Sequence, residues 1–327
     1  MRPFTYTRAT SVDDALAAIR GKSDAKFLGG GTNLVDLMKM GVERPAHLVD
    51  VTRLPLTNIE EHSGGVRIGA MATNKDIASH PLIRERYPVL SQALLSGASP
   101  QVRNKATAGG NLLQRTRCYY FYDPSYAECN KRNPGSGCAA RQGFNRIHAI
   151  LGVSDQCVAT HPSDMAVALA ALDAVILVKG PQGDRAIPIA DLHRLPGNTP
   201  QVDTNLRPGE LIVSIDLPAI PGMPRSHYLK VRDRNSFAFA LVSVAAVMDV
   251  DRGAIRNARI ALGGVAHKPW RVVQAETSLQ GKQPADDVFR AAADILLHGA
   301  TPLQHNAFKV EMAKRSVVRA LKTVAAL

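Results

Sequence analysis

Apolar and polar residues alternate along the chain in patterns that predict both helices and strands. Residues 15–19 form an apolar run behind Ser11 and two aspartates, which is typical of a capped helix start, because a hydroxyl and carboxylates favour the positive end of the helix dipole. Residues 25–28 predict a short buried strand, residues 29–31 a glycine turn, and residues 34–39 an amphipathic helix capped by Thr32-Asn33.

The same pattern divides the chain near residue 224. Three prolines fall within residues 217–224, so this stretch predicts a linker. After it, β-branched content and alternation predict strands at residues 226–231, 238–250 and 255–262, and apolar positions at helical spacing predict a helix at residues 308–324. We therefore expect a smaller α+β domain after the linker.

Length and composition allow several subdomains with proper cores. The chain has 327 residues, 45% of them hydrophobic, and domains usually span about 100–200 residues. No apolar run approaches the roughly 18 residues of a membrane helix, and the first residues carry no apolar export segment. We expect a soluble globular chain without an export signal of its own.

The formal net charge of +12 raises the question of an anionic partner. The lysines and arginines are scattered, however, and the densest groups are short: Arg115/Arg117, Lys131/Arg132 and Lys230/Arg232/Arg234. This distribution favours a solvated surface, anionic cofactors or an acidic partner over nucleic acid.

Two glycine-containing segments have the composition of phosphate-binding loops. In Gly29-Gly-Gly31, backbone N–H groups can approach a diphosphate without interference from Cβ atoms, although a plain tight turn is the alternative. Thr107-Ala-Gly-Gly-Asn111 again places small residues and a hydroxyl before an apolar stretch, and two such loops fit one diphosphate. His161-Pro-Ser-Asp164 precedes an expected helix at residues 165–172, where Ser163 or Asp164 either caps the helix or contacts the cofactor.

The four cysteines lie within one stretch of about forty residues, between the second glycine segment and His161-Pro-Ser-Asp164. Their spacing, Cys-x10-Cys-x8-Cys-x18-Cys, lacks the close pairs of structural zinc sites and does not match the common ferredoxin patterns. Taken alone, the cysteines leave an iron–sulfur cluster, zinc, and disulfides or free thiols open. Their place beside a nucleotide site indicates a redox relay.

In combination, the motifs resemble the FAD-binding medium subunit of the xanthine dehydrogenase family of molybdenum hydroxylases. They follow one another in the same order over nearly the whole chain: residues 26–34, 102–104, 107–111, 161–164, 208–212 and 228–234. Residues 118–123, 130–138 and 263–270 further resemble the FAD subunit of bacterial periplasmic aldehyde oxidoreductases.

The resemblance implies an α+β fold class: a two-subdomain FAD-binding fold of the PCMH type, followed by a smaller α+β domain of the CO dehydrogenase flavoprotein type. The domain limits that follow are 1–224, with subdomains at about 1–57 and 58–224, and 225–327. An insertion at about 115–158 would carry the cysteines.

The resemblance also implies the FAD contacts. Asp164 would accept hydrogen bonds from the cofactor, Leu211 and Ile212 would pack on it, and the cation of Lys230 would approach the flavin ring. The two loops would cradle the diphosphate through Lys26, Phe27, Leu28, Gly29, Gly30, Gly31, Thr32, Asn33, Leu34, Thr107, Ala108, Gly110 and Asn111.

For the cysteines, the resemblance implies a [4Fe-4S] cluster that most medium subunits of the family lack. Its ligands would be Cys118, Cys129, Cys138 and Cys157. The basic residues Arg115, Arg117, Lys131 and Arg132 would offset the charge of the cluster, and the aromatic residues 119–122 would limit its exposure to water.

The implied function is electron transfer within a heterotrimeric aldehyde oxidoreductase. A molybdenum cofactor in a large subunit and two [2Fe-2S] clusters in a small subunit would supply electrons, and FAD in this chain would pass them to an external acceptor. The complex would reach the periplasm on a partner's twin-arginine signal, with a cytoplasmic complex as the alternative. We assign no catalytic residue, and we expect His161 and His267 to be hydrogen-bonded structural residues.

Two rival functions predict different cofactors. A basic, zinc-stapled binding module for nucleic acid or an acidic protein would hold zinc and no flavin. A stand-alone FAD oxidase with two disulfides would hold flavin and no iron.

Overall fold

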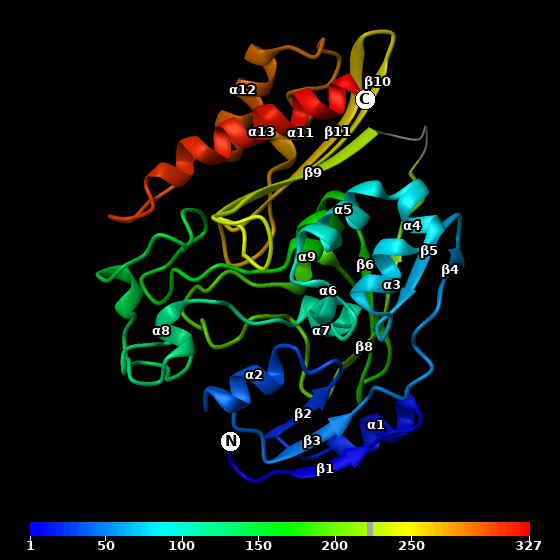
Figure 1. Ribbon diagram of the computed structural model, residues 1–327, viewed down its shortest axis with the longest axis vertical. Coiled ribbons are helices and arrows are strands. Elements are labelled where there is room, and N and C mark those ends of the chain that lie inside the picture. Colours follow the sequence, from blue (N-terminus) through cyan, green and yellow to red (C-terminus); the bar gives the residue numbers. More distant parts are fainter. Residues whose placement is uncertain (221–224) are drawn as a thin grey trace.

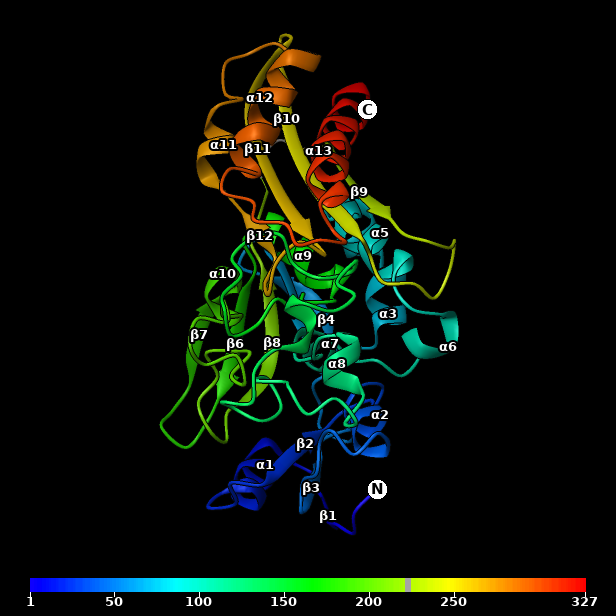
Figure 2. The same cartoon turned by 90° about the vertical axis from the view of Figure 1, so that its left-hand side faces the viewer.

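The computed structural model describes residues 1–220 and 225–327, and three sheets follow one another along this part of the chain (Figures 1 and 2). The first sheet is parallel, with strand order β1–β3–β2. Its elements are β1 (Thr5–Arg8), α1 (Val12–Ile19), β2 (Ala25–Leu28), α2 (Leu34–Lys39) and β3 (His47–Asp50). The helix, strand, turn and helix expected from the pattern are all confirmed, and Ser11 and Asp14 form a capping box on α1.

The second sheet has five strands in the order β4–β5–β8–β6–β7, and all of its neighbours pair antiparallel. Its elements are β4 (Ile59–His62), β5 (Gly65–Gly69), α3 (Asn74–Ser79), α4 (Pro81–Arg86), α5 (Pro88–Ser96), α6 (Pro100–Arg103), α7 (Ala108–Leu112), α8 (Tyr119–Tyr122), the 3-10 helix η1 (Ala139–Arg141), α9 (Asp164–Ala171), β6 (Val175–Lys179), β7 (Arg185–Pro188), α10 (Ile189–Leu192) and β8 (Leu211–Leu217).

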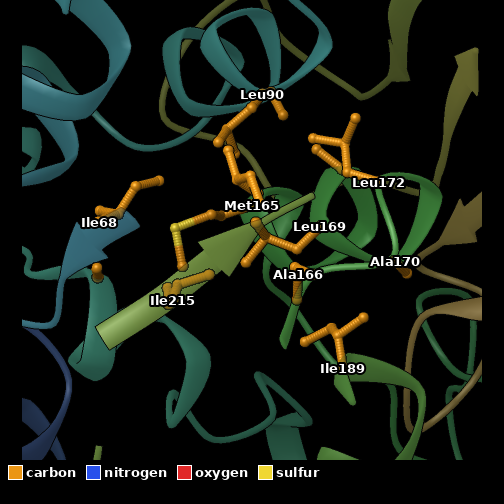
Figure 3. Close-up of a cluster of buried hydrophobic side chains, with 14 of the residues drawn as sticks. Ile68, Leu90, Met165, Ala166, Leu169, Ala170, Leu172, Ile189 and Ile215 are labelled. Atoms are coloured by element: carbon orange, nitrogen blue, oxygen red, sulfur yellow. The ribbon is translucent and has the colours of Figure 1, made fainter. Parts of the chain in front are cut away.

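Helix α9 runs through the core of the molecule. Every residue from Met165 to Ala171 is buried, because the small side chains of this alanine-rich helix let neighbouring elements approach it from all sides. Met165 lies between Leu90 of α5 and Ile215 of β8 (Figure 3). The start of α9 is thereby fixed between the second sheet and the C-terminal part of the chain.

The third sheet is antiparallel, with strand order β12–β11–β10–β9, and α13 packs on β9 and β10. Its elements are β9 (Arg225–Val231), β10 (Val242–Asp251), β11 (Ala254–Gly263), β12 (Trp270–Arg271), α11 (Val273–Thr277), α12 (Asp286–Leu296) and α13 (Phe308–Ala326). The strand expected at residues 238–250 begins later, at Val242, because the chain turns through Phe237 with a positive φ of 49°. Residues 221–224 of the expected linker lie outside the described residues.

Between α7 and α9 the cysteine segment, residues 115–158, wraps beside the N-terminal sheet with little regular structure apart from α8 and η1 (Figure 1). Its interior is a small core of its own, in which Phe121 and Val158 pack with buried cysteines and with Leu37 of α2. The segment is therefore a packed unit and not an open loop.

Candidate functional site

A cavity of about 820 Å³, a volume typical of sites for large ligands, lies between the two glycine loops, the start of α9 and the third sheet. Residues from each part of the chain line it, and six of the FAD contacts expected from the sequence are among them: Thr32, Asn33, Gly110, Asn111, Asp164 and Lys230.

The two glycine loops touch each other at the edge of this cavity. A Cβ atom on Gly30 would lie 1.7 Å from the carbonyl oxygen of Lys105, and one on Gly29 would lie 3.0 Å from Oγ1 of Thr107. Gly31 has a positive φ of 75°, which favours glycine. Glycine is therefore required where the loops meet, and both loops face the same cavity.

The other residues expected around the diphosphate lie behind the cavity wall. Lys26, on β2, is half exposed and pairs with Glu43 at 3.8 Å. The remaining members of this group, the three glycines of the first loop included, are not part of the lining: Phe27, Leu28, Gly29, Gly30, Gly31, Leu34, Thr107 and Ala108. Thr107 caps α7 by accepting a hydrogen bond from the backbone N–H of Gly110 at 3.3 Å, so it shapes the loop from outside the cavity.

Asn33 stands at the start of α2, but its side chain makes no capping bond, so the expected cap is wrong at this residue. Its Nδ2 instead donates to the hydroxyl of Tyr122 at 3.1 Å, and its Oδ1 accepts from the backbone N–H of Arg115 at 2.9 Å. The cysteine segment uses both polar atoms of this side chain, and Asn33 thus ties the first glycine loop to that segment.

Ser163 resolves one alternative left open by the sequence. Its Oγ accepts a hydrogen bond from the backbone N–H of Ala166 at 3.0 Å, so it caps α9. The same hydroxyl donates to Oδ1 of Asn111 at 2.6 Å. Ser163 therefore connects the start of α9 to the second glycine loop.

Lys230 is buried on the cavity wall and is not a solvated strand lysine. Its Nζ lies 2.7 Å from Oδ2 of Asp164 and donates to the carbonyl of Ser96 at 3.1 Å, and the side chains of Lys230 and Asp164 are 3% and 9% exposed. The hydroxyl of Tyr228 donates to the other carboxylate oxygen at 2.7 Å. Burial and the Asp164 charge hold the pKa of Tyr228 well above its ordinary value, so it stays a hydrogen-bond donor.

Leu211 and Ile212 lie on β8 in two different cores, and neither is among the residues that line the cavity. Ile212 stands behind the second glycine loop, 3.8 Å from the position of a Cβ on Gly109. Their contact with FAD stays a prediction.

Arg117 is a cavity residue that sequence reasoning placed only near the cysteines. Its guanidinium stacks on Tyr122 at 5.4 Å and on Phe239 at 5.0 Å, donates to the Tyr122 hydroxyl, and lies near Asp36. Burial lowers the pKa of Arg117 to about 10, which still leaves it charged at neutral pH. The sequence feature that could have indicated Arg117 as a site residue is its position directly before the first cysteine.

All four cysteines line a second, small cavity of about 10 Å³ together with Lys131. All four are free thiols in this structure, and Cys129 pairs with Cys138 across an isolated antiparallel bridge. A hydrogen bond from Cys157 lowers the pKa of Cys138 to about 6, whereas burial raises the pKa of Cys118 to about 12. The structure thus brings together the four residues that the sequence singled out.

Backbone N–H groups near three of the cysteines favour the thiolate form. They act to lower the pKa of Cys118, Cys138 and Cys157, although burial raises the pKa of Cys118 and the contact with Cys138 raises that of Cys157.

The basic residues around the cysteines are largely paired already. Lys131 donates to Asp203 and to the carbonyl of Pro200, and Arg115 contacts Asp203 at 2.8 Å and Glu43 at 2.5 Å. Burial alone would raise the pKa of Asp203, but Lys131 and Arg115 outweigh it and hold this pKa well below the ordinary range. Two cations thus face two carboxylates. The net positive charge around the cysteines is therefore smaller than the number of basic residues in the sequence indicates.

Arg132 donates to the backbone carbonyls of Tyr120 and Phe121, at 2.8 and 2.9 Å. It therefore fixes the turn of α8, in addition to carrying charge.

His267 is buried and His161 lies partly buried on the wall of the large cavity, but neither is the hydrogen-bonded residue expected from the sequence. Nε2 of His161 and both ring nitrogens of His267 have no partner in the described part of the chain. The His161 ring lies 4.1 Å from that of His193, whose Nε2 donates to the carbonyl of Leu112 at 2.8 Å. Burial lowers the pKa of all three histidines, so they are neutral at pH 7 and pack as uncharged rings.

Comparison with known proteins places both parts of the chain. Residues 2–220 match the family model described as the FAD-binding domain in molybdopterin dehydrogenase, and residues 227–324 match the CO dehydrogenase flavoprotein C-terminal domain. The chain is 52% identical over 325 residues to the aldehyde oxidoreductase FAD-binding subunit PaoB of Escherichia coli, which covers 98% of each chain. It is 30% identical over 324 residues to the carbon monoxide dehydrogenase medium chain of Hydrogenophaga pseudoflava, covering 97% of this chain and 96% of that one.

A solved structure agrees with these matches. Carbon monoxide dehydrogenase from Hydrogenophaga pseudoflava, in a form that lacks the Mo-pyranopterin moiety, superimposes with a TM-score of 0.78 at 29% identity, over 99% of this chain and 98% of that one. The α+β fold class expected from the sequence is confirmed. A chain with these matches is not a zinc-stapled binding module. The protein belongs to the molybdenum hydroxylase family of oxidoreductases, as a medium subunit that binds FAD.

Proposed function

We propose that this chain is the electron-transfer subunit of a molybdenum-dependent aldehyde oxidoreductase and that it holds a [4Fe-4S] cluster beside its FAD. One observation carries the proposal. The four cysteines, spread over about forty residues of sequence, line one small cavity next to the cavity suited to FAD. Electrons from aldehyde oxidation would reach FAD in this chain and leave to an external acceptor.

The large cavity fits FAD in its shape and in its chemistry. Its two touching glycine loops offer backbone N–H groups to a diphosphate, and its wall carries the buried Lys230 cation for the flavin ring. We propose the contacts Thr32, Asn33, Gly110, Asn111, Asp164 and Lys230, with the residues behind them as support. Bound FAD supplies the chemistry that links one-electron centres to the acceptor.

The donor set of the small cavity fits a four-iron cluster. Four thiols line one cavity, and nearby backbone N–H groups favour the thiolate form of three of them. In the described part of the chain, no three His, Cys, Asp or Glu side chains gather closely enough for a single metal ion. A cluster takes one thiolate for each iron, so its ligands stand farther apart. Since the cavity is only about 10 Å³, the thiols would rotate apart to admit it.

One turn of chain forms the wall between the two cavities. Arg117, Tyr119 and Tyr122 face the large cavity, whereas Cys118, Tyr120 and Phe121 face the small one. Because residues of the same turn face opposite sides, a single layer of side chains would separate the two cofactors. This closeness supports electron transfer between them.

We further propose a heterotrimer with a molybdenum-cofactor large subunit and a small subunit that carries two [2Fe-2S] clusters. The relative PaoB is named as the FAD-binding subunit of an aldehyde oxidoreductase, which supports the aldehyde substrate class. We keep the domain limits 1–224 and 225–327. Periplasmic location on a partner's twin-arginine signal agrees with a cluster assembled where thiols are reduced and exported in a folded complex.

The test compares the wild-type complex with Cys129→Ser, purified without oxygen and assayed for iron, acid-labile sulfide, zinc and FAD. We expect about four irons and four sulfides in this subunit for each FAD in the wild type. The Cys129→Ser variant should lose this iron and keep its FAD, because the glycine loops lie outside the cysteine segment. Ser125→Ala, exposed in the same segment, is the control and should keep both.

Two outcomes would contradict the proposal. Zinc in place of iron at the cysteines would assign them a structural metal. Full flavin content with disulfides and no subunit iron would favour a stand-alone FAD oxidase.

A further inference from the structure

His148 is a buried imidazole that contacts one of the proposed cluster ligands. Its Nε2 lies 3.1 Å from Sγ of Cys118, and the two residues are only 1% and 7% exposed. The spacing and the shielding from water are those of a hydrogen bond to sulfur. No motif in the sequence singled out this residue.

The chemistry of the ligand sets the direction of the bond. A cysteine bound to iron is a thiolate and carries no proton, so only an N–H of His148 can make the hydrogen bond. A neutral imidazole has one N–H, which must then sit on Nε2. Nδ1 has no partner in the described part of the chain, so nothing there competes for the proton.

The C-terminal domain holds this imidazole in place. The carbonyl of His148 accepts hydrogen bonds from Nζ of Lys309 at 2.8 Å and from Nδ2 of Asn306 at 3.2 Å. Lys309 lies on α13 and is fully buried, and it also donates to the carbonyl of Gly264 at 2.5 Å. A buried amino group that donates to backbone carbonyls is costly to displace, so this part of the main chain is rigid.

Aromatic rings limit the rotation of the imidazole. Tyr119 meets it edge-on at 6.4 Å between ring centroids, and Tyr120 lies at 6.2 Å on a tilted plane. Tyr119 also lines the FAD cavity. His148 thus acts on the cysteine whose chain neighbours form the wall toward the flavin.

We propose that His148 donates an Nε2–H···S hydrogen bond to Cys118 and thereby raises the midpoint potential of the [4Fe-4S] cluster. The inference rests on the cluster in the proposed function. A donor stabilises sulfur more strongly when the sulfur carries more negative charge, so it favours the reduced form. Lys309 and Asn306 are positioning residues that keep the imidazole on the sulfur.

The first test is a redox titration of the oxygen-free complex, with His148→Leu and His148→Gln beside the wild type. Iron and sulfide are measured on every sample. We expect His148→Leu to keep the four irons and to have a lower cluster potential, while the flavin potential is unchanged. His148→Gln, whose amide can still donate, should lie between Leu and wild type. His298→Leu, at an exposed histidine of the C-terminal domain, is the control and should match the wild type.

A second measurement does not depend on a variant that folds. In wild-type protein labelled with ¹⁵N-histidine, the reduced cluster should show hyperfine coupling to a histidine nitrogen, and His148→Gln should lose it. Absence of this coupling, or a His148→Leu cluster with the wild-type potential, would overturn the inference. If the wild type instead lacks the subunit's four irons and four sulfides, the proposed function itself fails, so the two failures are distinguishable.

Discussion

Gly30 shows how a single residue holds the FAD cavity together. The backbone carbonyl oxygen of Lys105 occupies the space that a Cβ atom on residue 30 would need, and it lies 1.7 Å from the ideal Cβ position. The neighbouring atom is main chain and cannot swing aside. Any side chain at this position must therefore push the loop at 105–107 away from the loop at 29–31.

The substitution Gly30→Ala should separate the two loops and empty the FAD site. We expect at least a tenfold fall in FAD affinity, equal to about 1.4 kcal/mol, with the iron content of the subunit unchanged. Fluorescence titration of FAD into the stripped subunit measures the affinity. Gly253→Ala is the control, because this hairpin glycine lies outside the FAD cavity and, although it has a positive φ, has nothing within 4 Å of its Cβ position. Equal affinity in both variants would contradict the assigned cradle.

Residues whose role depends on a local property of the residue type could be predicted from the sequence. A glycine turn before a helix indicates close backbone approach, and four clustered cysteines indicate that their side chains meet in the fold, whatever surrounds them. The roles of Asn33, Arg117 and His148 could not be predicted, because each is set by a partner that is close in space and distant or unmarked in sequence. Asn33 was expected to cap a helix, but its side chain meets Tyr122, 89 residues away.

At the scale of elements, the cysteine segment is anchored by ion pairs as well as by its small core. Asp203 lies between β7 and β8 and accepts hydrogen bonds from Lys131 and Arg115, one at each carboxylate oxygen. Lys131 is almost fully buried, with a side-chain exposure of 2%. Removal of the carboxylate charge would leave two cations near the cysteine cavity with a single acidic partner, Glu43.

We expect Asp203→Asn to loosen this segment, because breaking a buried ion pair costs about 3–5 kcal/mol. Hydrogen exchange at residues 115–132 should be at least tenfold faster than in the wild type, and the iron should be lost more readily to a chelator. Asp155→Asn tests the same segment at its surface, where the Asp155 side chain is 90% exposed and pairs with Arg141, and should change exchange little. Unchanged exchange in Asp203→Asn would show that the small core alone holds the segment.

Longer elements with a clear period were predictable, and short ones were not. Alternation and β-branched residues predicted β9 and β11 to within a residue at each end, and helical spacing predicted α13. The helices α3, α4, α6 and α7 have six residues or fewer, too few turns to show a periodic face. Tertiary contacts around the cavity fix their positions. The local sequence does not reveal such contacts.

At the scale of the whole molecule, the interior contains histidines that folding keeps uncharged. His193 and His267 are buried and His161 lies partly buried beside them, so charging any of the three rings is costly. The fold could be predicted from the order of the motifs and not from the composition. The order of the motifs did not indicate this histidine cluster. The three residues come from separate loops, and only the packing of the second sheet against the C-terminal domain brings them together.

This cluster predicts how stability depends on pH. The pKa of His193 is lowered to about 4 and that of His267 to about 3 by burial, whereas the unfolded chain protonates histidine near pH 6.5. The unfolded state therefore binds more protons below pH 6.5, and stability should fall as pH drops from there toward 5. Each of these histidines contributes about 1.4 kcal/mol for each pH unit.

Urea unfolding between pH 7 and 5, where most carboxylates stay ionised, measures this slope. His193→Gln keeps a donor for the carbonyl of Leu112 and removes one titrating ring, so its unfolding should take up one proton fewer than that of the wild type. His298→Gln removes an exposed histidine outside this cluster and should leave the slope unchanged. If the His193→Gln slope equals that of the wild type, this ring is protonated in the native protein, and the cluster does not exclude charge from the interior.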